Sequence, residues 1–231
     1  MAYSFTWAGV SSTTHGLYVE KITPPIRPAT RQERTPIPGK DGYLTTGDST
    51  LGEVMRYAEC YLPDLTKRDA ILAWLQGSGN VIFSTESDRY CKATILDQIE
   101  FTNDVLPANF LIVPFACQPY RYLYPETSVT LVNGGVTGTF NNTGTAPAEP
   151  VISLTGTGDI ALTIGAKTLY IDDLSGDITI DVPAGLAYNG TVNLTYKLTG
   201  DWPFTIATGA NATSWTGTLT AATMLPNRRY Y

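Results

Sequence analysis

The densest group of side chains that could do chemistry is acidic, formed by Asp172, Asp173, Asp177 and Asp181. Carboxylates that face each other across a cleft serve acid/base catalysis, and about six converging oxygens bind calcium. The spacing favours a simpler interpretation. Ser175-Gly176-Asp177 has the composition of a turn, and Asp172-Asp173 stands at a predicted strand end, where Asx side chains accept hydrogen bonds from local amides. We therefore predict neither a catalytic nor a calcium site here.

The other candidates for chemistry are one histidine and three cysteines. His15 precedes Gly16 in a Ser/Thr-rich segment, which predicts an exposed turn residue and not a general base. Cys60, Cys91 and Cys117 are widely spaced with no Cys-x-x-Cys pair, so we predict buried free thiols and neither a disulfide framework nor a zinc site. The sequence has no P-loop, His-Glu-x-x-His or nucleophile elbow. We expect no enzyme activity, no metal and no cofactor.

Charge and hydropathy limit the partners. The 231 residues carry a net charge of −6, which argues against sequence-specific nucleic-acid binding through clustered Lys and Arg. The longest apolar run, 110–116, is interrupted by Pro114 and is shorter than the roughly 20 residues that span a bilayer, so we expect no membrane insertion. The N-terminus has no basic segment followed by an apolar run, which predicts a protein made in the cytoplasm.

The residues before Pro125 predict an α+β domain. One helix is expected from Leu65, capped by Asp64 or Thr66 and ended by Gly77, with an apolar stripe that comprises Leu65, Ala70, Ile71, Trp74 and Leu75. Runs of aromatic and β-branched residues predict strands at 3–7, 17–22, 54–62, 81–83, 90–96 and 110–117.

Two segments of this part are predicted to lie outside a central sheet. Residues 22–31 contain three prolines, which lack the amide hydrogen that a sheet needs, so an extended arm is expected. Residues 38–52 contain four glycines around Lys40-Asp41-Gly42 and predict a long hairpin or mobile loop.

Composition changes near Pro125, since 24 of the 36 charged residues precede residue 126, and this predicts a boundary between domains 1–125 and 126–231. Short alternating runs then predict an antiparallel β-sandwich. The expected strands are 129–132, 136–141, 151–154, 160–164, 167–171, 178–182 and 192–198. The expected turns are 133–135, 156–159, 165–166, 175–177 and 189–190.

Two groups of motifs resemble one family in the same order. Tyr188-Asn189-Gly190, Gly200-Asp201-Trp202-Pro203-Phe204, Gly209-Ala210-Asn211 and Arg228-Arg229 resemble the C-terminal end of siphophage distal tail proteins. Arg31, Arg34 and Ile37, followed by Gly39-Lys40-Asp41-Gly42, look like the arginine strand and turn of that family's N-terminal domain. The resemblance spans nearly the whole chain.

The resemblance implies a structural protein of the virion, in the phage tail tip, assembled in the host bacterial cytoplasm. It implies a galectin-like fold for the second domain and a homo-hexameric ring formed by the first. The ring would join the tail tube protein to tail-tip and tail-associated proteins, with the tape measure protein and a receptor-binding protein as further partners. The candidate subunit interface comprises Arg31, Arg34, Gly39, Lys40, Asp41 and Gly42, and the candidate family-motif positions of the second domain are Asp201, Trp202, Pro203, Gly209, Asn211 and Arg228.

Several alternatives stay open. Arg31 and Arg34 are either interface residues that pair with a neighbour's carboxylate or ordinary solvated strand residues. Trp202 and Trp215 are interpreted as core or inter-domain anchors in preference to sugar-stacking platforms. For the whole chain, the rival functions are a carbohydrate-binding, lectin-like module, an accessory subunit of a glycoside hydrolase, and the tail-tube protein itself.

Overall fold

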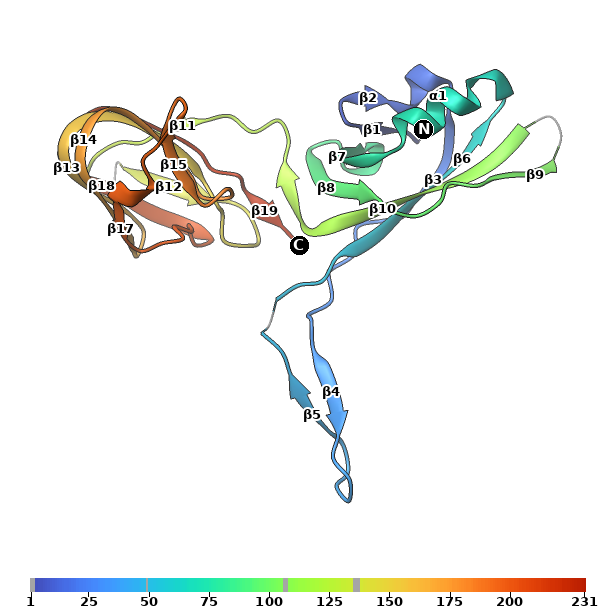
Figure 1. Cartoon of the computed structure of the whole chain (residues 1–231), viewed down its shortest axis with the longest axis horizontal. Coiled ribbons are helices and arrows are strands. Elements are labelled where there is room, and N and C mark those ends of the chain that lie inside the picture. The colour runs from blue at the N-terminus through green and yellow to red at the C-terminus, as the bar shows by residue number, and fades with distance from the viewer. Residues whose placement is uncertain (1–2, 49, 106–107, 135–137) are drawn as a thin grey trace. The chain divides into compact units, whose positions relative to one another are not determined.

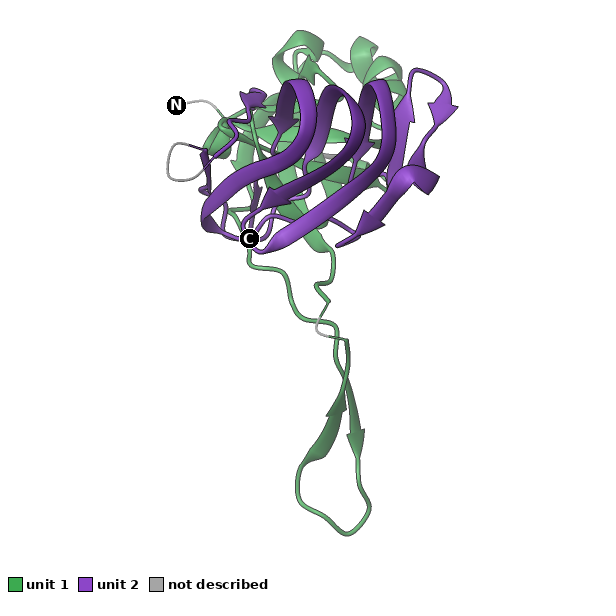
Figure 2. Ribbon diagram, turned by 90° about the vertical axis from the view of Figure 1, so that its left-hand side faces the viewer, with its two compact units in different colours: residues 1–124, 231 green, residues 125–230 purple. Residues whose placement is uncertain are grey.

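The computed structural model describes residues 3–48, 50–105, 108–134 and 138–231. The chain forms two compact units, Met1–Tyr124 with Tyr231 as unit 1 and Pro125–Tyr230 as unit 2 (Figure 2). Both are built mainly from antiparallel strands, and the described residues contain one α-helix (Figure 1). This confirms the predicted mainly-β fold class with a single helix. None of the described helices is long and apolar enough to cross a membrane.

The main sheet of unit 1 has the strand order β2-β1-β7-β8-β10-β6-β3, and β9 pairs with β10. All of the predicted strands are present, and two of them are longer than expected, because β7 and β10 continue through glycine and polar residues. The bounds are β1 Phe5–Trp7, β2 Val10–Ser11, β3 Tyr18–Ile22, β6 Val54–Leu62, β7 Gly77–Phe83, β8 Arg89–Ile95, β9 Phe101–Val105 and β10 Ala108–Leu123.

The predicted helix is present but shorter and tighter at its start. A 3-10 turn, Leu65–Lys67, leads into α1, Arg68–Trp74, and the Asp64 carboxylate accepts the amide of Thr66 at 3.1 Å as predicted. Ile71 is fully buried, whereas Leu65 is 48% exposed and Ala70 is also exposed, so the predicted stripe was wrong at those two positions. Leu75 ends the helix, and Gly77, at φ +73°, begins β7.

Aromatic side chains form the core of unit 1. The ring of Phe115 lies 5.3 Å from Phe5 and 5.6 Å from Trp7 and Phe83. Trp74 brings the helix onto this cluster, because it stacks on Phe5 and donates its indole N–H to the carbonyl of Trp7 at 3.3 Å. Such aromatic contacts add about 1 kcal/mol each to the burial of area.

The segment between β3 and β6 leaves the sheet. Its first part, the proline arm, is extended as predicted, and a bridge between Thr30 and Leu51 closes the base of the segment. Beyond the bridge, β4 Glu33–Pro36 and β5 Tyr43–Thr46 pair only with each other, as a two-stranded sheet. Both views show this hairpin standing clear of the unit 1 sheet (Figures 1 and 2). A hairpin or mobile loop was predicted at 38–52, and the hairpin observed begins earlier, at Glu33, and ends at Thr46.

Unit 2 is organised around three long strands. β13 Val151–Ile164 lies between β14 Lys167–Asp181 and β18 Gly209–Leu225, in a sheet of order β11-β18-β13-β14-β15-β16. β12 pairs with β18, and β17 pairs with β14. The shorter strands are β11 Val129–Thr130, β12 Thr139–Asn142, β15 Leu186–Asn189, β16 Val192–Asn193, β17 Leu198–Gly200 and β19 Arg229–Tyr230.

The long strands bend, so that their two halves enclose one core. Ile152 and Ile180 near one end and Leu162 and Leu169 near the other belong to the same buried cluster. The β13–β14 register shifts by one residue between Gly158 and Ile160, where a bulge lets the strands turn. The sheet therefore folds over itself into the predicted sandwich.

Several predicted turns and strands of unit 2 differ from those in the structure. The segments 156–159 and 175–177, predicted as turns, lie inside β13 and β14, because their glycines serve the bends. The predicted strand 192–198 is interrupted by a 3-10 turn, Thr195–Lys197. The turns at 165–166 and 189–190 are present, whereas the turn at 133–135 and the strand at 136–141 lie partly outside the described residues. β18 was missed altogether.

Candidate assembly surfaces

The β4–β5 hairpin carries five of the six residues predicted at a subunit interface. Arg34 lies on β4, and Gly39, Lys40, Asp41 and Gly42 form the connecting turn. Gly39 and Gly42 adopt φ angles of +79° and +91°, a conformation that favours glycine, and the Lys40 amide donates to the Ile37 carbonyl at 3.2 Å. All of these residues are exposed, so the turn chemistry leaves the charged side chains free to meet a partner.

Arg34 and Arg31 have different surroundings. The Arg34 guanidinium lies 4.8 Å from the centre of the Tyr43 ring on the neighbouring strand, a cation–π contact within the hairpin. Arg31 precedes β4 at the base of the hairpin, where its amide donates to the Thr50 carbonyl at 2.7 Å. The structure therefore places Arg34 on the hairpin, with the turn, and Arg31 at its root.

The hairpin and the arm that leads to it expose apolar side chains. Ile26, Ile37, Tyr43 and Leu44 are between 41% and 55% exposed. A two-stranded hairpin is at best marginally stable in water, because it has no second layer on which to bury such residues. This surface is consequently suited to contact with another protein.

A second exposed apolar surface lies on the sheet of unit 1, and the sequence analysis missed it. Tyr18 on β3, Tyr61 on β6 and Phe110 on β10 form a cross-strand row, with ring centres 5.0 and 6.3 Å apart. Ile112, 54% exposed, lies one outward position further along β10. The alternation of buried and outward residues along β6 was the available signal. We call these four residues the aromatic face.

A buried charge cluster fixes the start of the proline arm. The Arg56 guanidinium lies 3.1 Å from Glu86, which also pairs with Arg121. Arg56 further donates to the Thr23 carbonyl at 2.9 Å and lies over the Phe83 ring at 4.0 Å. With Arg56 only 2% exposed, this cluster holds the arm against a rigid part of the sheet.

In unit 2, Asp201 joins two strands. Its carboxylate accepts the Thr168 amide at 2.8 Å and lies 3.6 Å from the Lys167 ammonium, and its own amide donates to the Thr168 carbonyl at 2.9 Å. The backbone hydrogen bond from Thr168, helped by the charge of Lys167, lowers the pKa of Asp201 below its ordinary value of 3.8. Asp201 thus secures the beginning of β14 to the end of β17.

Two further motif residues, Gly209 and Asn211, fix the conformation of the chain where β18 begins. Gly209 has a φ of +86°, and Asn211 is 4% exposed. The Asn211 amide donates to the carbonyls of Ala207 and Gly209 at 2.9 and 2.8 Å, which closes the turn before the strand. These residues serve the fold of unit 2.

Trp202 and Pro203 follow Asp201, and the peptide bond between them is cis. Trp202 is 36% exposed, so it is not a core residue of unit 2, contrary to the interpretation as a core anchor. Trp215 is partly buried and packs against the core of that unit.

Arg228, the last motif residue, forms a buried ion pair. Its guanidinium lies 2.8 Å from the Glu126 carboxylate, and its backbone amide also donates to that carboxylate at 3.1 Å. It lies over the Phe140 ring at 5.1 Å. Burial raises the pKa of Glu126, although Arg228 opposes the shift. The pair ties the first residues of unit 2 to its last strands.

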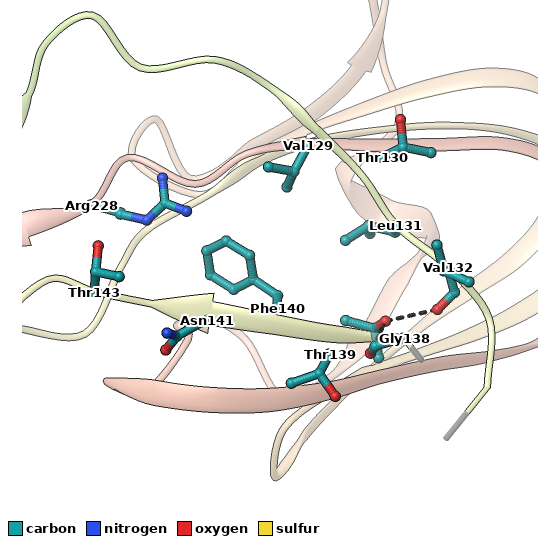
Figure 3. A pocket seen from close by; sticks show the side chains of 11 residues that line it. Val129, Thr130, Leu131, Val132, Gly138, Thr139, Phe140, Asn141, Thr143 and Arg228 are labelled. Atoms are coloured by element: carbon teal, nitrogen blue, oxygen red, sulfur yellow. Dashed lines mark hydrogen bonds between the residues drawn. The ribbon is translucent and has the colours of Figure 1, made fainter. Parts of the chain in front are cut away.

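Arg228 and Phe140 also line an open cavity of about 420 Å³ (Figure 3). Leu131 and Asn141 lie on other parts of its wall. Thr213 also lines it. The described residues that line it include no acid/base pair and no nucleophile beside a base.

The residues considered for catalysis are dispersed. Asp172, Asp173 and Asp177 lie inside β14, so Asp172 and Asp173 are not at the predicted strand end and Asp177 is not in the predicted turn. The Asp173 amide donates to the Asp159 carboxylate at 2.9 Å. His15 ends a 3-10 turn, Ser12–His15, and is half-buried against Trp74 with ring centres 4.4 Å apart, so the prediction of an exposed residue was wrong. Among the described residues, no three potential metal ligands converge.

Comparison with known proteins gives a likeness to a solved structure. No family model matches the chain, and no curated protein matches it. Among solved structures, the chain is similar to the Dit protein of phage SPP1, with a TM-score of 0.77 and 15% sequence identity over 100% of both chains. That protein is described as a paradigm of the hub adsorption apparatus in phages that infect Gram-positive bacteria. The chain therefore has the fold of a siphophage distal tail protein along its entire length.

Proposed function

We propose that this chain is the hub subunit at the distal end of a long non-contractile phage tail. The observation that carries the proposal is the fold shared with SPP1 Dit over the full length of both chains. Six copies would close into a ring around a channel for DNA. A ring of this kind needs no cofactor, because one heterologous interface repeated about a closed axis builds it.

The ring contacts belong to unit 1 in this proposal. The hairpin of one subunit, with Arg34, Lys40 and the exposed Leu44, reaches the next subunit and lies on its aromatic face. The apolar side chains of both surfaces are then buried, which supplies about 25 cal/mol for each Å² removed from water. The charged side chains of the hairpin fix the register by pairing with carboxylates of the neighbour.

Unit 1, which covers most of the predicted domain 1–125, is then the ring-forming domain, and the sandwich of unit 2 is the attachment domain. The tail tube protein binds on one side of the ring. The tail-tip protein, the tape measure protein and a receptor-binding protein are the remaining partners. The hub is a virion component, assembled in the host bacterial cytoplasm.

Mass photometry of the full chain, followed by negative-stain electron microscopy, tests this function. We expect a six-fold ring of 25.0 kDa subunits at low micromolar concentration. A monomer whose melting temperature rises with an added glycan would instead support the lectin-like alternative, since a ligand that binds only the folded state stabilises it. A monomer that ignores glycans would contradict both functions.

A further inference from the structure

Two of the three buried cysteines line the same small cavity in unit 1. Cys91 on β8 and Cys117 on β10 are 3% and 1% exposed. The strands are antiparallel neighbours, with Cys117 opposite Ala93, and their register shifts just beyond Cys117. Cys91 lies opposite Arg121 beyond this shift, so the two cysteines are diagonal neighbours in the register and line one cavity. The cavity measures about 10 Å³, roughly the space that one water molecule occupies.

A fixed positive charge lies beside one of these thiols. The Arg56 guanidinium donates to the Cys91 sulfur at 3.7 Å. The thiol of Cys117 and the charge of Arg56 lower the pKa of Cys91 to about 7, although burial opposes the shift, and the same pairing raises the pKa of Cys117. A substantial fraction of Cys91 is thus thiolate at neutral pH, next to the protonated thiol of Cys117.

Cys60 provides the internal comparison. It is fully buried in the same unit, and burial raises its pKa to about 12. Reaction with oxidants requires the thiolate, so Cys60 should be inert where Cys91 is reactive.

The cavity lies close to solvent. Ile26 of the proline arm lines it and is itself 47% exposed, so this lining residue also faces bulk water. Gln118 and Pro119 complete that wall. Ile26 must move aside for a molecule the size of hydrogen peroxide to reach the cavity, and we expect a bulky disulfide such as oxidised glutathione to be excluded.

We propose that Cys91 is a peroxide-reactive thiolate and that Cys91 and Cys117 close to a disulfide. The Cys91 thiolate attacks one oxygen of hydrogen peroxide, the O–O bond breaks, and the departing hydroxide takes a proton from solvent to become water. Cys91 is left as a sulfenic acid. The Cys117 sulfur then attacks that of Cys91, the S–O bond breaks, and the hydroxide leaves as water with the Cys117 proton. Two thiols are oxidised by two electrons, and the peroxide is reduced to two waters.

The disulfide would cross-link β8 to β10 at the place where their register shifts. It would restrict opening of the sheet next to Arg56 and the root of the proline arm. The inference rests on residues of unit 1 alone, and its test does not depend on the proposed function.

The test uses the full chain, reduced and then moved into buffer without thiols. After treatment with hydrogen peroxide, the protein is denatured, its remaining thiols are alkylated, and its peptides are mapped by mass spectrometry. We expect Cys91 and Cys117 to escape alkylation together, as one linked peptide, while Cys60 stays alkylated. Loss of the Cys91 thiol should exceed that of Cys60 by more than about tenfold in rate. Equal rates, or a bond that joins two chains, would overturn the proposal.

Two variants test the role of each cysteine. In Cys117→Ala, the sulfenic acid of Cys91 has no resolving thiol and should accumulate as a dimedone adduct. In Cys60→Ala, the matched control, disulfide formation should be unchanged. If Cys117→Ala fails to fold, the peptide map of the unaltered chain still decides, and an alkylated Cys91 at the end of that experiment would refute the proposal.

Discussion

Arg34 differs from an ordinary solvated arginine by its position over the Tyr43 ring, which holds its guanidinium on one face of the hairpin. Replacing it with alanine should change the free energy of unfolding by no more than about 0.5 kcal/mol, because the site is exposed. Assembly should weaken at least about tenfold, since a neighbour's carboxylate loses its partner. Mass photometry against concentration measures this. Arg68→Ala removes the same charge from an exposed position on α1 and should leave assembly intact.

The lowered pKa of Asp201 predicts that the stability of the fold depends on pH. Its pKa is lowered in the folded state, so its stabilising effect is present above its ordinary value of 3.8 and is lost as the pH falls through the lower, folded value. Asp201→Asn should reduce the melting temperature at pH 7, and the difference from the unaltered chain should shrink below about pH 4. Asp172→Asn, which removes a charge from an exposed site on β14, is the control and should show no such convergence. Scanning calorimetry at several pH values checks both.

At the scale of elements, the hairpin contributes to assembly and not to the core, since every residue of β4 and β5 is exposed. Replacing residues 33–46 with a short Gly-Ser turn should preserve the bridge between Thr30 and Leu51 and leave the melting temperature within a few degrees of its original value. The same change should abolish the ring. Rings that persist without the hairpin would show that the sheet of unit 1 supplies the contact by itself.

The bend in β18 depends on Gly217. Its φ is +90°, and a Cβ atom there would lie 2.3 Å from the Asp159 carbonyl oxygen. Gly217→Ala should therefore destabilise unit 2 by about 2 kcal/mol or more. Gly190→Ala, at a φ of +58° with no atom within 4 Å of the added methyl, should cost only about 1 kcal/mol. Chemical denaturation of both variants distinguishes a clash from the conformational cost alone.

The elements also show where sequence patterns were informative. β6 alternates buried and outward residues, and its bounds were predicted without error. β18 was missed because its Thr, Ala and Gly residues give little contrast between faces, and its pairing with β11, β12 and β13 is long-range. The glycines of β13 and β14 were wrongly interpreted as turn residues, because glycine is typical both of turns and of bends within a strand. Arg34 and the Gly39–Gly42 turn were found from their motif, whereas the aromatic face required knowing which strands are neighbours.

For the whole molecule, net charge gives a further prediction. Each chain carries −6, so a ring of several copies repels the phosphate backbone and should let DNA pass without holding it. A gel-shift assay with duplex DNA at about 50 mM salt is the most demanding condition, because phosphate contacts are strongest at low salt. We expect no retardation. Retarded duplex would reveal a basic patch on the ring and indicate that the hub grips DNA.

The position of β18 in the strand order has a consequence for synthesis. β18 is a central strand of unit 2, between β11 and β13, yet it extends to Leu225. A nascent chain therefore cannot complete this sheet until residues up to Leu225 have left the ribosome, whereas the main strands of unit 1 are available by Leu123. Domains tend to fold as units during translation, from the N-terminus onward. If unit 1 forms the ring as proposed, its contact surfaces would fold before β18 has joined β13 in unit 2. Neighbouring nascent chains would then meet through unit 1 first.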